Sequence, residues 1–112
     1  MSRKLLSLHR QLPGVQAKEA LDAVLVAGVF EQELALLFRD DGVWQLVESK
    51  LTEELAESIR SLPDYGIDAV YVCECSLSER KLTPEDLILS ATVLSAAEQG
   101  ELLSSQDMVL CD

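Results

Sequence analysis

The stretch ELALLF, residues 33–38, is apolar at five consecutive positions after its leading glutamate. Strands with one solvated face alternate between apolar and polar residues, whereas strands buried on both faces of a parallel sheet read as near-continuous apolar runs. The following residues, RDDG at 39–42, are typical of a turn. We therefore expect the chain to pass through the middle of a parallel sheet here and to turn sharply at its carboxyl end.

The residues on either side of this stretch alternate between the periods of strands and helices. Helix 17–31 has almost no polar face in its second half, which favours cover on both sides, the second by another subunit. Ser76 and Glu79 fit a capping box, and Thr83 to Asp86 repeats the start signal for a short turn. The expected strands are 4–9, 33–38, 67–72, 87–89 and 108–111; the expected helices are 17–31, 48–61, one from residue 76, and 94–103.

This alternation predicts one domain, residues 1–112, with a small doubly wound, mainly parallel five-stranded sheet and helices on both faces. Parallel strands need crossover connections, and helices of this length supply them. In such α/β folds a ligand or reactive site lies beyond the carboxyl ends of the strands, near the switch in strand order. Three segments qualify: residues 9–14, 39–46 and 73–76.

Composition and charge limit the partners. The chain has 112 residues, 9 basic and 20 acidic, for a formal net charge of −11. Phosphate backbones are bound by clustered Lys and Arg, so direct nucleic-acid binding is not expected. No apolar run approaches the length of a membrane span, and the basic, then apolar N-terminus is interpreted as the first strand rather than a leader. The three cysteines form a poor disulfide framework and favour a reducing compartment, the cytoplasm.

The candidate chemistry centres on Cys73, at the end of the third strand. A following helix would stabilise its thiolate, while Glu74 and Glu79 would disfavour a second negative charge. In a flavodoxin-like strand order the first and third strands are neighbours, so His9 is a candidate base. The alternative is a passive buried thiol, since free cysteine is among the most buried residue types.

Other sites lack support in the sequence. Cys75 and Cys111 are interpreted as passive, because a C-x-C pair with one distant histidine falls short of the four ligands of structural zinc. No phosphate-binding loop and no nucleophile elbow occurs in the chain. We therefore expect neither a metal nor a cofactor.

Three stretches together resemble a known family. Residues 18–46 resemble the helix, strand and "DGVxQL" turn of the DsrE/DsrF/DsrH superfamily, especially its TusC or DsrF branch; VYVCECSLSERKL, 70–82, resembles that branch's "VCxxSLxERGL", and DMVLCD, 107–112, its closing strand. Lys81 stands where the family motif has glycine. The residues that match the two motifs and that we single out are Asp41, Gly42, Gln45, Cys73, Ser76, Glu79 and Arg80.

The resemblance implies a small α/β subunit of a hetero-oligomer with TusB/DsrH-like and TusD/DsrE-like paralogues. Such complexes relay persulfide sulfur through sulfur-carrier proteins, in the Tus case toward 2-thiolation of the wobble uridine of tRNA. The family's established carrier cysteine lies on the TusD/DsrE-like subunit, which implies a mainly structural, assembly role for this chain. Two alternatives follow from the same resemblance: Cys73 carries persulfide itself, or the chain serves a DsrF-like role in dissimilatory sulfur oxidation.

Overall fold

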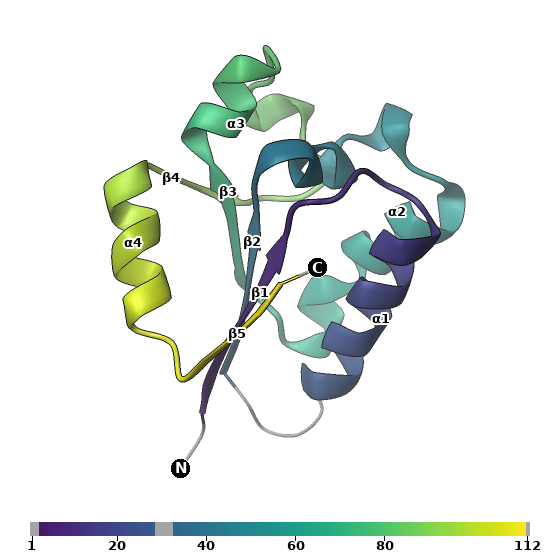
Figure 1. Ribbon diagram of the computed structural model, residues 1–112. Coiled ribbons are helices and arrows are strands. Elements are labelled where there is room, and N and C mark those ends of the chain that lie inside the picture. The colour runs from purple at the N-terminus through teal and green to yellow at the C-terminus, as the bar shows by residue number, and fades with distance from the viewer. Residues whose placement is uncertain (1–2, 29–32, 112) are drawn as a thin grey trace.

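The computed structural model describes residues 3–28 and 33–111 of the chain, which form a five-stranded sheet flanked by helices (Figure 1). All four strand pairings are parallel. Short 3-10 turns at Asp40–Leu46 (η1), Glu48–Lys50 (η2), Leu62–Tyr65 (η3) and Pro84–Asp86 (η4) link the main elements. These are β1 Lys4–His9, α1 Val15–Gly28, β2 Glu33–Phe38, α2 Glu53–Arg60, β3 Ala69–Cys73, α3 Glu74–Glu79, β4 Thr92–Leu94, α4 Ala96–Ser104 and β5 Met108–Cys111.

The predicted fold class is confirmed, because α1 and α2 cover one face of the parallel sheet and α4 covers the other (Figure 1). The strand order is β4-β3-β2-β1-β5. The expectation that the first and third strands are neighbours is wrong, since β2 lies between them and pairs with both. β1 and β3 are therefore two strand spacings apart, roughly 9–10 Å.

The stretch 33–38 forms the central strand and supplies both layers of the core. Its residues alternate between the two faces, as the pleat of a strand requires. Leu34, Leu36 and Phe38 belong to the core cluster under α1 and α2, where Leu21, Ile59 and other apolar residues meet them. Ala35 and Leu37 face the opposite side, in a smaller cluster against which Leu102 and Leu103 of α4 pack.

Two predicted strand and helix boundaries near the site are wrong. The fourth strand is at Thr92–Leu94, not 87–89. The apolar segment 87–89 instead packs on the core under α1 and α2, and Leu87 forms an isolated antiparallel bridge with Val47. The helix expected from residue 76 begins at Glu74, with extended Cys73 as its N-cap and no side-chain capping bond. This earlier start places Leu77 in the core, at 4% exposure.

The remaining boundaries agree more closely. The expected helix 48–61 is a 3-10 turn followed by α2, which Thr52 caps by accepting a hydrogen bond from Leu55 N. The short turn expected at 83–86 is present with its capping box. The helix expected at 17–31 is α1, and residues 29–31 of that prediction lie outside the described residues.

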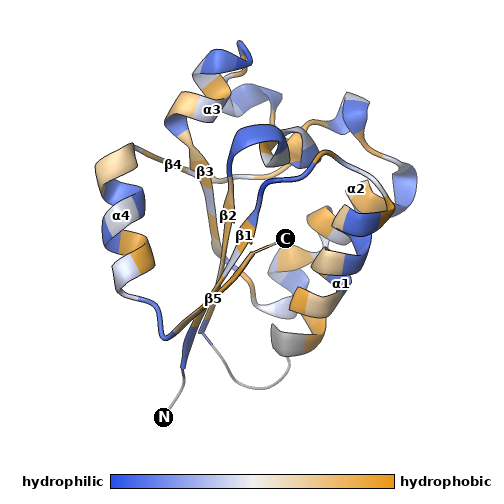
Figure 2. Cartoon of the chain, in the orientation of Figure 1, coloured by the Kyte–Doolittle hydropathy of each residue, from blue (hydrophilic) through white to orange (hydrophobic). Residues whose placement is uncertain are grey.

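Apolar side chains also occur on the surface. Met108, Val109 and Leu110 on the edge strand β5 are 42–47% exposed, and Val15 and Val26 on α1 are 75% and 60% exposed. Figure 2 shows β5 as a hydrophobic strand at the edge of the sheet. The protein thus exposes apolar surface on one sheet edge and on one helix.

Within residues 3–28 and 33–111, every helix is too short or too polar to cross a bilayer.

Candidate functional site

Cys73 ends β3 at the point where the chain connections change face. β3 leads into α3, whose Leu77 packs in the core shared with α1 and α2. The neighbouring strand β4 leads into α4, which packs on the opposite face. Connections that diverge in this way leave a crevice at the carboxyl ends of the two strands, and α/β proteins bind ligands there. The expectation of a site beyond the strand ends therefore leads to the segment that begins with Cys73.

A cavity of about 340 Å³ opens at this crevice. The turn after β2 forms one wall, α3 forms the second, and the first two turns of α4 form the third. Of the three segments expected to hold a site, 39–46 and 73–76 meet here. The lining residues are Arg39, Asp40, Cys73, Cys75, Ser76, Glu79, Ala96, Gln99, Gly100 and Leu103.

Cys73 is 9% exposed, and two opposing effects act on the pKa of its thiol. Burial raises its pKa, because the charged thiolate loses water. Hydrogen bonds outweigh this effect: the Ser76 hydroxyl and backbone N–H, the Gln99 side chain and the Cys75 backbone N–H all favour the thiolate, so the pKa is lowered overall. These hydrogen bonds favour the thiolate, which is the nucleophilic form of a cysteine side chain.

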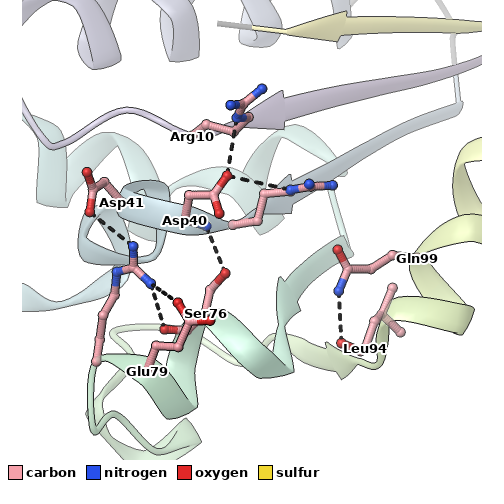
Figure 3. Close-up of polar contacts among 9 residues, drawn as sticks. Arg10, Asp40, Asp41, Ser76, Glu79, Leu94 and Gln99 are labelled. Atoms are coloured by element: carbon pink, nitrogen blue, oxygen red, sulfur yellow. Dashed lines mark hydrogen bonds and ion pairs between the residues drawn. The ribbon is translucent and has the colours of Figure 1, made fainter.

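Ser76 owes its orientation to the neighbouring turn. Its Oγ accepts a hydrogen bond of 2.8 Å from the backbone N–H of Asp40 (Figure 3). An oxygen that accepts from one side keeps its own proton for another acceptor, and the Cys73 sulfur lies within its reach. Asp40 reaches this position with a φ of 53°, and Arg10 and Arg39 both contact its carboxylate, at 3.3 and 3.7 Å.

Arg80 joins the two sequence motifs. Its Nη1 donates to the backbone carbonyl of Ser76 at 3.1 Å, and its Nη2 donates to Asp41 Oδ1 at 3.1 Å. The Arg80 side chain is 18% exposed, and Glu79 lies 3.6 Å from its Nη1. The guanidinium thus fixes α3 to the turn after β2, and both of these elements line the cavity.

Gly42 and Gln45 act on the other side of the same turn. A Cβ at Gly42 would lie 2.0 Å from the carbonyl oxygen of His9, so only glycine allows this close approach of two backbones. Gln45 is fully buried, and its Nε2 donates to the carbonyl of Gln11 at 2.9 Å. Both residues hold the turn after β2 against the loop after β1, and neither lines the cavity.

The candidate base does not reach the thiol. His9 is fully buried, its Nε2 is hydrogen-bonded to Ser7 Oγ at 2.9 Å, and its ring stacks on Phe38 at 5.0 Å. Because β2 separates β1 from β3, the proposed pairing of His9 with Cys73 is wrong.

The two other cysteines lie apart from each other. Cys75 is exposed and lines the cavity, and Cys111 is exposed on β5. Among residues 3–28 and 33–111, His, Cys, Asp and Glu side chains do not gather in threes as a metal site requires.

Gln99 is the site residue that the sequence did not reveal. It lies near Cys73 because β4 pairs with β3 and α4 folds back over that face, so that both residues line the cavity. Ser76, which also lines the cavity, could be singled out from the sequence because it belongs to a family motif. No local pattern distinguishes Gln99 from any other polar residue on a helix.

The comparisons with known proteins agree with one another. The model of the DsrE/DsrF-like family matches residues 4–111. A protein TusC homolog from Pseudomonas aeruginosa is 38% identical, over 98% of this chain and 98% of the relative. The intracellular sulfur oxidation protein DsrF from Allochromatium vinosum is 32% identical, over 96% and 94%. In fold, the crystal structure of the ychN protein from E. coli matches with a TM-score of 0.83 at 17% identity, covering 98% of this chain and 99% of that one.

Proposed function

The chain belongs to the DsrE/DsrF-like family, and on this premise we propose that it is a TusC-like subunit of a hetero-oligomeric sulfurtransferase complex. Its partners are paralogous TusB/DsrH-like and TusD/DsrE-like subunits. The complex relays persulfide sulfur through carrier proteins for 2-thiolation of the wobble uridine of tRNA. This chain acts mainly in assembly, and the observation that carries the proposal is the full-length similarity to a TusC homolog.

The surface of the chain supports an assembly role. Val26 on α1 and the apolar side chains of β5 are exposed in the isolated subunit, and exposed apolar patches mark surfaces that bind other proteins. A net charge of −11 disfavours direct contact with tRNA. An assembling subunit does not need that contact.

Cys73 supports a second candidate function, because its lowered pKa and its place in the cavity suit sulfur transfer. In that reaction the Cys73 thiolate attacks the outer sulfur of a donor persulfide, R–S–SH. A new S–S bond forms on Cys73, the donor S–S bond breaks, and R–S⁻ leaves with the bonding electrons. The exchange needs no external oxidant or reductant, and the next acceptor thiol removes the sulfur by the same step.

The similarity to DsrF supports a second role for this chain, in sulfur oxidation rather than tRNA thiolation. The same subunit chemistry fits a DsrF-like role in sulfur oxidation, which the 32% identity to the Allochromatium vinosum protein favours. The TusC homolog has the higher identity, at 38%. We therefore place the tRNA role first.

Deletion of the gene, followed by measurement of 2-thiouridine in total tRNA, tests the proposal. We expect thiolation to be lost and to return with the wild-type gene; unchanged thiolation after deletion would refute the tRNA role. Complementation with Cys73→Ser separates the two candidate functions. Full restoration supports assembly alone, whereas no restoration by a variant that still enters the complex shows that the Cys73 thiol is required and supports sulfur transfer through it.

A further inference from the structure

Gln99 is a buried polar side chain on the face of α4 that packs against the sheet. It is 6% exposed, and its Nε2 donates one hydrogen bond of 3.1 Å to the carbonyl oxygen of Leu94 (Figure 3). A glutamine amide has two N–H donors, and buried donors are nearly always paired. The bond to Leu94 therefore accounts for one donor and leaves the second to be placed.

The register of the sheet brings the anchor of the Gln99 amide next to Cys73. Leu94 is the direct partner of Cys73 across the β3–β4 pairing. An amide fixed on the Leu94 carbonyl is thus held one strand away from the Cys73 sulfur, and both residues line the same cavity. The other lining residues of α4 are Ala96, Gly100 and Leu103, which have no polar side-chain atoms.

We propose that Gln99 is a positioning residue for Cys73: its amide, anchored on Leu94, donates its second N–H to the Cys73 sulfur and holds the thiolate toward the cavity. The proposal rests on the second candidate function, in which Cys73 accepts sulfur. The Gln99 side chain is among the groups that lower the pKa of Cys73, in agreement with such a bond. With Ser76 on α3 and Gln99 on α4, the sulfur receives donors from both walls of the crevice.

The charges around the cavity explain why an uncharged donor suits this position. Arg39 and Asp40 face the cavity from the turn after β2, Cys75 and Glu79 face it from α3, and α4 adds no charged side chain. The two carboxylates disfavour a further negative charge nearby. An amide N–H stabilises the thiolate without forming an ion pair with those carboxylates, so its hydrogen bond stays directed at sulfur.

The test is the pH profile of alkylation of Cys73 in the full chain, followed by mass spectrometry of the peptide that contains it. In Gln99→Met we expect the midpoint to rise by about one pH unit. Gln99→Glu, of nearly the same size, should raise it further, because a carboxylate would face the thiolate. Gln106→Met is the matched control, because the Gln106 amide also donates to a backbone carbonyl, that of Leu102 in α4 at 3.1 Å. The alkylation midpoint of Cys73 should not move in this variant.

A Cys73 midpoint that is unchanged in both Gln99 variants would overturn the proposal. Urea unfolding of each variant separates this effect from a loss of fold, because a structural role alone lowers stability without moving the midpoint. Failure of the second candidate function, sulfur transfer through Cys73, gives a different result. Wild-type chain treated with a persulfide donor would then gain no sulfur on Cys73, while the difference between wild type and Gln99→Met in alkylation would remain.

Discussion

Replacement of Lys81 by glycine should stabilise the protein. Lys81 has a φ of 57°, in the left-handed region, directly after the C-cap of α3. Leu82 N bonds to Leu77 O at 2.9 Å and Lys81 N bonds to Ser78 O at 3.1 Å, the two hydrogen bonds of a Schellman motif, in which the left-handed position is usually glycine. This geometry gives a physical reason for the glycine of the family motif at this position.

The magnitude follows from two opposing terms. A left-handed conformation costs a residue with a Cβ about 1–2 kcal/mol, and Lys81→Gly removes that cost. Glycine loses about 0.5–1 kcal/mol more than other residues in conformational entropy on folding. The net gain is about 0.5–1 kcal/mol in the free energy of unfolding, which corresponds to a few degrees in melting temperature.

Urea denaturation followed by circular dichroism measures this gain as a higher midpoint at constant slope. Lys81→Ala is the matched control, because alanine removes the same side chain but keeps the Cβ and its strain. We expect Lys81→Ala to stay within about 0.5 kcal/mol of wild type. Equal stability of wild type and Lys81→Gly, or a less stable glycine variant, would refute the assignment of strain to Lys81.

Two further predictions concern the turn and the thiol. Gly42→Ala should lower the free energy of unfolding by at least about 2 kcal/mol, because its Cβ would lie 2.0 Å from the His9 carbonyl oxygen; Gly100→Ala, with no atom within 4 Å of the added Cβ, is the control in the same urea experiment, and equal losses would count against the contact. Ser76→Ala should raise the pH midpoint of Cys73 alkylation, because the Ser76 bonds lower the pKa of the thiol; an unmoved midpoint would show that the hydroxyl does not reach the sulfur.

The elements that local sequence encodes were predicted well. The run at 33–38 is buried on both faces in the structure, as its unbroken apolar character predicts. Cys73 does end the third strand. The apolar segment 87–89 was wrongly predicted as a strand, because a partly buried apolar loop has the same sequence pattern as a short strand. Only the pairing of Thr92–Leu94 with β3 separates the two.

Features that depend on strand order could not be read from the sequence. His9 was expected beside Cys73, and the intervening β2 follows from which strands pair across the sheet rather than from any local motif. The capping box expected at Ser76 fails for a similar reason. The Ser76 hydroxyl accepts a hydrogen bond from Asp40, 36 residues away in the chain, because β2 and β3 end side by side.

Co-expression with the TusB-like and TusD-like proteins of the same organism, followed by native mass spectrometry, tests the assembly role most directly. We predict one hetero-oligomer that contains all three chains. Leu110→Asp, which places a charge on the exposed apolar edge of β5, reports whether that edge takes part. A stable complex of the other two proteins that excludes this chain, with this chain monomeric on its own, would contradict the account.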